Sequence, residues 1–208
     1  MTRALPVRET LEDAVNPAHT ALLVIDTQYD LQGEDGPAMF PRLERLIGAA
    51  RDAGVYVVYT QNVTLPDGLS SSPAELARRR KLGRTRPVTV DGSPGCQIVE
   101  LLAPRPGDAV VRKHRMSCSV GTNLDLLLRC RGIETVVCTG IATHGCVLNT
   151  AYAALAHDYY VVVVDDCVAM GAAIGPELQE AARVLLRSAM HHFVDSERLI
   201  DVWKCTSA

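Results

Sequence analysis

The sequence predicts an α/β fold in which helices cover both faces of a parallel β-sheet. Two observations lead to this prediction. Short apolar runs with the composition of buried strands alternate along the chain with longer segments of helical periodicity, the order typical of parallel sheets. The chain has 208 residues, of which 48% are hydrophobic, and this is enough for one sizeable core. A single domain is therefore expected.

The first part of the chain contains two predicted strands with a helix between them. Residues 21–26 read ALLVID, a continuous apolar run ending in an acid, as expected of a strand that is buried on both faces. A loop rich in Gly, Asp and Pro leads into a helix over residues 41–53, which closes at Gly54. The run VYVVYT at 55–60 is the second strand. Asp26 then lies at the carboxyl end of the first strand.

The segment from residue 61 to 95 has the weakest pattern. It is rich in Pro, Gly and Ser, and a segment of this length within a compact domain often forms a functional lid or contains short helices of its own. Its basic stretch contains Arg78, Arg79, Arg80 and Lys81. A run of charges is most often a solvated helix face, so we favour this interpretation over an anion site, an interface or a substrate lid.

The second half of the chain continues the alternation. Predicted strands cover residues 109–113, 135–139, 159–165 and, more briefly, 192–194. Predicted helices cover residues 97–102, 120–131, 146–157 and 176–191, and a final turn or helix follows. In such parallel sheets, ligands bind outside the carboxyl ends of the strands. Side chains at these ends are therefore the first candidates for a functional site.

Charge and composition limit the possible partners. The formal net charge of -3 gives no basic face for nucleic acid or for an anionic membrane, so a small molecule or a protein is the expected partner. The seven cysteines include no CxxC pair of the kind that closes a zinc site. Reduced thiols in a cytoplasmic protein fit this pattern best.

The ends of the chain contain no targeting or membrane signal that we can identify. The first 17 residues are too polar, and too interrupted by Pro6 and Pro17, to contain the apolar region of a signal peptide. No run approaches the roughly 20 apolar residues of a membrane span. We therefore expect residues 1–18 to form a surface arm and residues 19–208 to form the single domain.

Three reactive side chains meet at the predicted carboxyl edge of the sheet. Asp26 ends the first strand, Lys113 ends the third, and Cys146 begins the helix that follows the fourth. Taken singly, each has a simpler explanation: a turn cap, an exposed charge and a buried apolar residue. Together they provide a base for the thiol proton, a cation that stabilises the thiolate, and a nucleophile that attacks a carbonyl.

The turn before Cys146 adds further expectations. Unpaired N–H groups and the helix dipole at a helix start predict a lowered pKa for Cys146. Backbone N–H groups of Ala142 and Cys146 are the candidates for an oxyanion hole. His144 either contacts the substrate or points away, and the sequence leaves both possibilities open.

Three segments also carry a resemblance to a known family. The segments ALLVIDTQ, VVRKHRMS and VCTGIATHGCVLNTAYAALAHDYYVVVVDDC resemble the isochorismatase-like cysteine hydrolases over residues 20–195. The resemblance implies a three-layer α/β/α sandwich with a six-stranded, mostly parallel sheet, and a catalytic triad of Asp26, Lys113 and Cys146. It also implies an acyl-enzyme intermediate, a cis peptide bond between Ile141 and Ala142, no metal or other cofactor, and a homodimer or homotetramer.

The details of the resemblance favour the amidohydrolase branch, nearest to ureidoacrylate and N-carbamoyl amidohydrolases. The stretch YTQNVTLPDGL lacks the histidines of a metal-dependent nicotinamidase. The thiol of Cys146 is absent from true isochorismatases. By the same similarity, Tyr29 and Asn62 line the substrate pocket, and Met116 replaces an aromatic residue there.

The predicted function is hydrolysis of a small carboxamide or of a ureido or carbamoyl compound, a linear C–N bond that is not a peptide bond. The reaction is expected to pass through a thioester. Two alternatives are an ether hydrolase of the isochorismatase type, which needs no thiol, and a non-catalytic binding protein of the same fold. Loss of turnover on removing the thiol distinguishes the first prediction from both.

Overall fold

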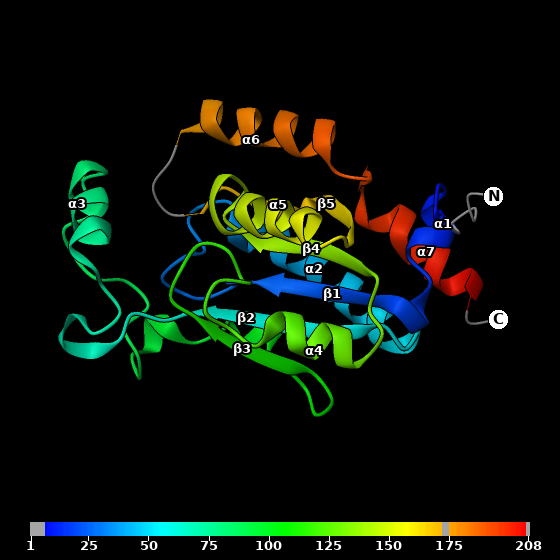
Figure 1. Cartoon of the computed structure of the whole chain (residues 1–208), viewed down its shortest axis with the longest axis horizontal. Helices are drawn as coiled ribbons and strands as arrows, with labels where there is room; N and C mark the ends of the chain where they lie inside the picture. Colours follow the sequence, from blue (N-terminus) through cyan, green and yellow to red (C-terminus); the bar gives the residue numbers. More distant parts are fainter. Residues whose placement is uncertain (1–6, 172–174, 207–208) are drawn as a thin grey trace, which may run out of the picture.

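The computed structural model describes residues 7–171 and 175–206, and its centre is one parallel sheet. The strand order is β3-β2-β1-β4-β5-β6, and each neighbouring pair of strands is parallel. Figure 1 shows these strands between layers of helices. The predicted fold class is thereby confirmed. The strands are β1 (Thr20–Ile25), β2 (Tyr56–Asn62), β3 (Ala109–Lys113), β4 (Thr135–Ile141), β5 (Tyr160–Ala169) and β6 (His192–Val194).

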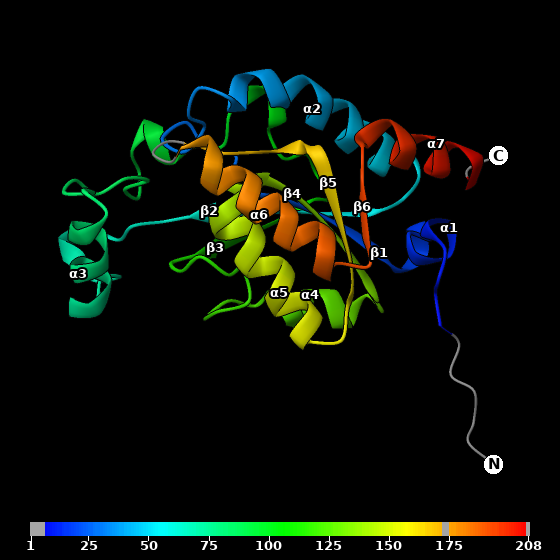
Figure 2. The ribbon, with the colours of Figure 1, turned by 90° about the horizontal axis from the view of Figure 1, so that it is seen from above.

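Helices cover the two faces of the sheet. In Figure 2, α2 and α7 lie on one face, whereas α4, α5 and α6 lie on the other. The α-helices are α1 (Leu11–Ala14), α2 (Gly36–Asp52), α3 (Pro73–Lys81), α4 (Leu124–Cys130), α5 (Leu148–Ala156), α6 (Pro176–Ala189) and α7 (Ser196–Thr206). Short 3-10 turns are η1 (Pro17–His19), η2 (Pro66–Gly68), η3 (Pro94–Cys96) and η4 (Glu100–Leu102), and η5 (Thr143–Val147) is a π-helical turn.

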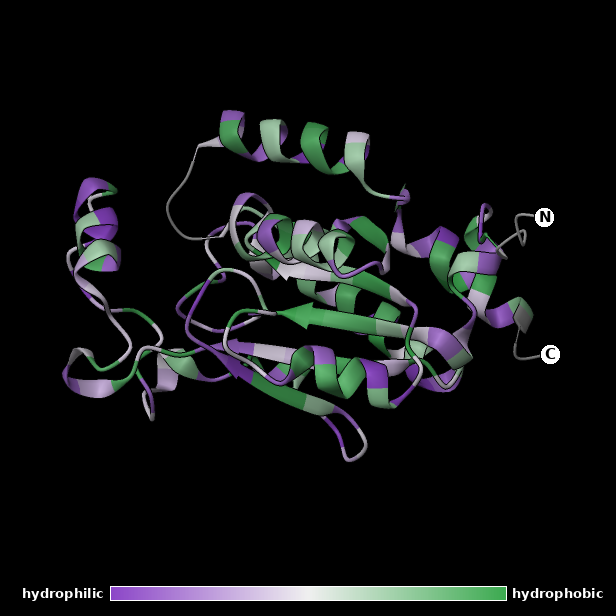
Figure 3. Cartoon of the chain, viewed as in Figure 1, coloured by the Kyte–Doolittle hydropathy of each residue, from purple (hydrophilic) through white to green (hydrophobic). Residues whose placement is uncertain are grey.

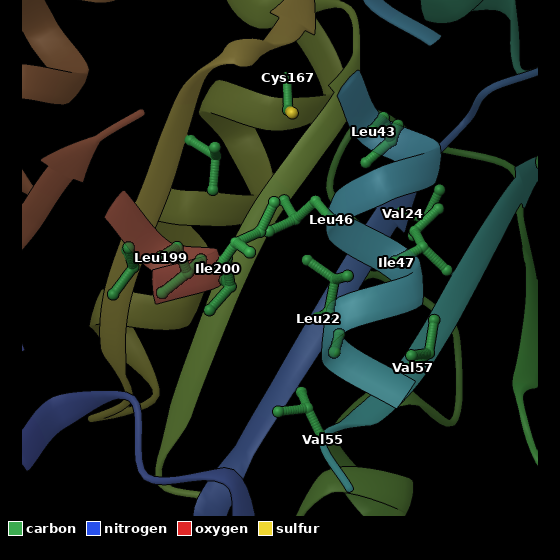
Figure 4. Close-up of a cluster of buried hydrophobic side chains, with 14 of the residues drawn as sticks. Leu22, Val24, Leu43, Leu46, Ile47, Val55, Val57, Cys167, Leu199 and Ile200 are labelled. Carbon is green, nitrogen blue, oxygen red and sulfur yellow. The ribbon is translucent and has the colours of Figure 1, made fainter. Parts of the chain in front are cut away.

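Each face of the sheet has its own hydrophobic core, and strand β1 contributes to both. Leu22 and Val24 point toward α2, whereas Leu23 and Ile25 point toward α4 and α5, as the alternation of a strand requires. Figure 4 shows the first core, where side chains of α2 meet those of β1, β2 and α7. Burial on both faces explains why the strand is a continuous apolar run.

Several predicted helices differ from the structure; α4, for example, begins at Leu124 rather than at residue 120. Helix α2 begins at Gly36 rather than at residue 41, so Pro41 lies within the helix. Pro37 occupies the first turn, where a missing N–H costs little, and Pro41 forgoes only one further backbone hydrogen bond. The helix predicted over 97–102 is only the short 3-10 turn η4.

Helix α3 projects from the carboxyl end of the sheet (Figure 1). Ser72 caps it by accepting a hydrogen bond from the backbone N–H of Glu75, and Pro73 begins its first turn. None of its residues is buried. In Figure 3 much of α3 has hydrophilic colours, in contrast to the apolar strand β1. The helix therefore depends on its cap and on its flanking segments rather than on the core.

The expectation of a surface arm over residues 1–18 needs correction where the structure describes it. Leu11, Ala14 and Val15 are buried in the core beside α7, and the indole N–H of Trp203 donates to the carbonyl of Val15. Three apolar residues within a polar segment were too few to indicate this packing. No helix in the described ranges is both long and apolar enough to cross a bilayer.

Candidate active site

The topology of the sheet places the candidate site between β1 and β4. The strand order reverses direction at this point: β2 and β3 lie on one side of β1, whereas β4 and β5 lie on the other. A crevice therefore opens beyond the carboxyl ends of these two strands. Asp26 directly follows β1, and Cys146 follows β4 within η5.

Asp26 is fixed in a fully buried position. Its backbone has a φ of 50°, in the left-handed region that few non-glycine residues adopt, and its N–H donates to the carbonyl of Thr60 at 3.2 Å. The hydroxyl of Thr60 donates to Oδ1 of Asp26 at 2.7 Å. The unusual turn thus directs the carboxylate toward the neighbouring strand ends.

Lys113 reaches Asp26 from the edge of the sheet. It is the last residue of β3, two strands away from β1, and its side chain is fully buried. Nζ lies 2.7 Å from Oδ2 of Asp26 and also donates to the carbonyls of Arg115 (2.9 Å) and Met116 (3.2 Å). The ammonium is therefore held by an ion pair and two carbonyl oxygens.

The thiol of Cys146 completes the cluster. Nζ of Lys113 donates to Sγ at 3.3 Å, so a single ammonium contacts both the carboxylate of Asp26 and the sulfur. Cys146 lies in the π-helical turn η5, in which the N–H of Val147 donates to the carbonyl of Ala142 five residues earlier. The peptide bond between Ile141 and Ala142 is cis, as the resemblance implied. The three side chains predicted from the strand ends thus meet in the fold.

The expected lowering of the thiol pKa is wrong for this state of the protein. Burial raises the pKa of Cys146 and the negative charge of Asp26 raises it further, whereas the charge of Lys113 lowers it. The regular helix α5 begins only at Leu148, so Cys146 precedes the first α-helical turn. The resting thiol is consequently protonated near neutral pH.

The ammonium keeps its proton in the same surroundings. Burial acts to lower the pKa of Lys113, but the negative charge of Asp26 and its hydrogen bond act against burial, and the pKa is raised overall. The resting cluster is therefore a carboxylate, an ammonium and a thiol. Its two formal charges cancel, which reduces the cost of burying them.

A cavity of about 250 Å³ opens above the sulfur. Cys146, Ala142 and Asn62 line it, in agreement with their predicted places, and Met116 lines it as well. Tyr29 does not: it is absent from the lining, and its hydroxyl instead accepts a hydrogen bond from the backbone N–H of Glu100. That bond holds the ring beside η4, so the predicted role of Tyr29 in the pocket needs correction.

The basic stretch is divided between the cavity and the solvent. Arg78 and Arg79 are half-buried and line the cavity, whereas Arg80 and Lys81 are exposed and do not. The interpretation as a solvated helix face is therefore wrong for the first two residues. Their spacing from Glu75, three and four positions along a helix, was the available signal of a shared face.

His144 also lines the cavity, which answers the question that the sequence left open. Burial lowers the pKa of this imidazole, and the charge of the nearby Arg84 lowers it further. Its Nδ1 is buried without a hydrogen-bond partner in the part of the chain that the structure describes. A neutral imidazole therefore forms part of the cavity lining.

Comparison with known protein families then identifies the fold family. The model of the isochorismatase domain matches residues 20–198, which is most of the chain. The chain belongs to the isochorismatase family. This result confirms the resemblance seen in the sequence. The Asp26, Lys113 and Cys146 cluster is the set of reactive groups that this member of the family places at its sheet edge.

Individual relatives agree with the amidohydrolase branch. The ureidoacrylate amidohydrolase RutB of Methylorubrum extorquens is 37% identical over 185 residues, which cover 78% of this chain and 74% of that protein. The crystal structure of N-carbamoylsarcosine amidase from Thermoplasma acidophilum is 28% identical, with a TM-score of 0.70, over 86% of this chain and 96% of that chain.

A third relative shows how much of the fold is shared. The crystal structure of a cysteine hydrolase from Pseudomonas syringae pv. phaseolicola 1448A superposes with a TM-score of 0.81. The match covers 99% of this chain and 100% of that chain at 22% sequence identity. The architecture of this isochorismatase-family protein is therefore found across nearly its whole length in a distant relative.

Proposed function

We propose that the protein is a cysteine-dependent amidohydrolase that cleaves a small carboxamide or a ureido or carbamoyl compound at a C–N bond other than a peptide bond. One observation carries the proposal: the ammonium of Lys113 contacts both the carboxylate of Asp26 and the sulfur of Cys146, and Cys146 lines a cavity. The relatives named as amidohydrolase and amidase support the same reaction class.

The first half of the proposed reaction forms a thioester. Asp26 accepts the thiol proton while Sγ of Cys146 attacks the substrate carbonyl, which is necessary because the resting thiol is protonated. The carbonyl π-electrons move to oxygen, and backbone N–H groups of Ala142 and Cys146 are the proposed donors to this oxyanion. The C–N bond then breaks, and the nitrogen leaves as ammonia or an amine with the proton from Asp26.

The second half restores the enzyme. Asp26 takes a proton from water as the water oxygen attacks the thioester carbonyl. Collapse of this second intermediate breaks the C–S bond, and the sulfur regains the proton from Asp26. Lys113 remains protonated throughout and stabilises the negative charge on whichever of Asp26 and Cys146 carries it.

Other features of the resemblance stay predictions. The proposed reaction uses protein side chains alone, a homodimer or homotetramer is expected, and the cytoplasm is the expected location. Leu178, Val184 and Leu185 on α6 are about half exposed and form a candidate contact between subunits. Light scattering of the purified protein measures the oligomeric state directly.

Removal of the thiol tests the proposed function. Cys146→Ser is expected to reduce ammonia release from a panel of amides and ureido compounds by several orders of magnitude, because a hydroxyl is a far weaker nucleophile than a thiol. Cys205→Ser, which changes an exposed thiol, is the matched control and should keep full activity. Undiminished ammonia release by Cys146→Ser would falsify the cysteine mechanism. No turnover by the parent on any compound of the panel would favour the ether hydrolase or the binding protein.

A further inference from the structure

The side chains that line the cavity carry far more positive than negative charge. Among the described residues that line it, Glu75 is the only acid. Five arginines line the same space: Arg78, Arg79, Arg84, Arg86 and Arg115. Four of the five belong to α3 or to the segment that follows it, so a single projecting element supplies most of the positive charge.

Only one of these guanidinium groups is neutralised within the described chain. Arg78 makes two hydrogen bonds to Glu75, at 2.9 and 2.8 Å. Arg79 and Arg115 donate to backbone carbonyls, those of Arg86 and Ser70 respectively, and a carbonyl does not cancel the charge. Neither Arg79, Arg84, Arg86 nor Arg115 forms an ion pair with a described carboxylate.

Only some residues of the basic run line the cavity. Arg80 and Lys81 belong to the same basic run but are exposed and do not line the cavity. Arg79 and Arg84, in contrast, are half-buried at its wall. A purely solvated run would expose these side chains alike, so the two half-buried arginines that line the cavity point to a ligand that compensates their charge.

We propose that the substrate carries a carboxylate, and that Arg79 and Arg84 bind this group on the side of the cavity formed by the α3 segment, while its amide or ureido carbon faces Cys146. This inference rests on the proposed function, because it takes Cys146 as the nucleophile. A guanidinium pairs with a carboxylate through two parallel hydrogen bonds, which fixes the orientation of a small substrate as well as its charge. The cavity, at about 250 Å³, suits a small acid rather than a large ligand.

Two thiol reagents of nearly equal size test the inference without requiring a known substrate. Iodoacetate is an anion and iodoacetamide is neutral, and both alkylate thiolates. The ratio of their rates at one cysteine is independent of the thiolate fraction, so the raised pKa of Cys146 does not affect it. We expect the iodoacetate-to-iodoacetamide ratio at Cys146 to exceed that at the exposed Cys205 by at least about tenfold, and to fall as salt is added.

Arginine variants then locate the anion site. In Arg79→Gln/Arg84→Gln, the ratio at Cys146 is expected to fall toward that at Cys205, while the iodoacetamide rate stays close to the parent value and reports an intact fold. Arg80→Gln removes one equal charge from the same run and should leave the ratio unchanged. Equal ratios at Cys146 and Cys205 in the parent, or an equal effect of Arg80→Gln, would overturn the inference.

The same variants connect the anion site with turnover. For a hydrolysed carboxylated amide and its methyl ester, Arg79→Gln/Arg84→Gln should raise KM for the acid and leave the ester nearly unaffected. A parent enzyme that prefers the neutral ester would contradict the inference and leave the proposed reaction intact. Turnover that survives in Cys146→Ser would contradict the proposed reaction instead, so the two failures are distinguishable.

Discussion

At the scale of single residues, the charges of Asp26 and Lys113 influence whether the thiol of Cys146 keeps its proton. The carboxylate of Asp26 and the ammonium of Lys113 lie 2.7 Å apart with no exposure to solvent, and they cancel each other. The thiol of Cys146 therefore lies close to the positive charge of Lys113, which favours its ionisation, and to the negative charge of Asp26, which opposes it. Since burial adds to the opposing effect, the proton stays on sulfur until a substrate is attacked.

These opposing charges predict that Asp26→Asn makes the thiol of Cys146 more reactive while abolishing catalysis. Without the carboxylate, the remaining ammonium of Lys113 should lower the pKa of Cys146, and each unit of decrease gives about tenfold more thiolate below the pKa. Alkylation of Cys146 by iodoacetamide at pH 7 should become faster, whereas ammonia release should be lost because no base accepts the thiol proton. Mass spectrometry of the labelled peptides and an ammonia assay measure the two effects.

The control for this prediction is Asp52→Asn, which removes an exposed carboxylate at the end of α2. It should change neither rate. If Asp26→Asn kept the turnover of the parent, Asp26 would not be the base. If it lost turnover without faster alkylation, Asp26 would not be the group that keeps the proton on sulfur.

The residues of the site could be predicted where they lie at the ends of strands that the sequence reveals. Asp26, Lys113 and Cys146 each follow a recognisable apolar run, and the rule that parallel strands share a carboxyl edge brings them together. Thr60 was not predictable, because its hydrogen bond to Asp26 depends on the register that pairs Ile25 with Thr60. Neither was the direction of the pKa shift at Cys146, since burial is not visible in a local sequence.

At the scale of elements, the site depends on how closely β4 approaches β1. Gly140 has a φ of 103°, and a Cβ added to it would lie 2.0 Å from the carbonyl oxygen of Ile25. Both the backbone conformation and the contact therefore require glycine at this position. This close approach places the turn that carries Cys146 beside Asp26, the residue after Ile25.

Substitution of this glycine should separate the two strand ends. Gly140→Ala is expected to reduce activity by at least about a hundredfold, because displacements near 1 Å have effects of this size on catalysis. Gly48→Ala is the matched control, since a Cβ there has no neighbour within 4 Å and the residue lies within helix α2. Its activity should be unchanged and its stability slightly increased. Full activity of Gly140→Ala at normal yield would contradict the required close approach.

The helix α3 shows why the wall of the cavity could not be predicted. Ser72 caps the helix locally, but the direction of its arginines depends on contacts between distant residues. The N–H of Thr64 donates to the carbonyl of Thr89, and the N–H of Asp91 donates to the carbonyl of Thr64. This pairing joins the two ends of the segment and directs it over the site, which a local pattern cannot show.

At the scale of the whole molecule, the candidate site and helix α1 lie toward opposite ends of the sheet. Helix α3 extends beyond the carboxyl ends of the strands, whereas α1 lies near their amino ends and α7 covers one face of the sheet there (Figures 1 and 2). The end with the candidate site contains a buried ion pair and a cavity. The opposite end contains an apolar contact among Leu11, Val15 and Trp203, all buried.

The stability of the molecule should accordingly depend on the segment around α1. Leu11→Ala is expected to lower the free energy of unfolding by about 2 kcal/mol, near the lower end for a buried leucine because the side chain keeps slight exposure. Val7→Ala, at a residue that is 64% exposed, should have little effect. The single tryptophan, Trp203, is fully buried, so its fluorescence during urea unfolding follows this end of the molecule. Equal midpoints for Leu11→Ala and the parent would show that burial of this segment contributes little to stability.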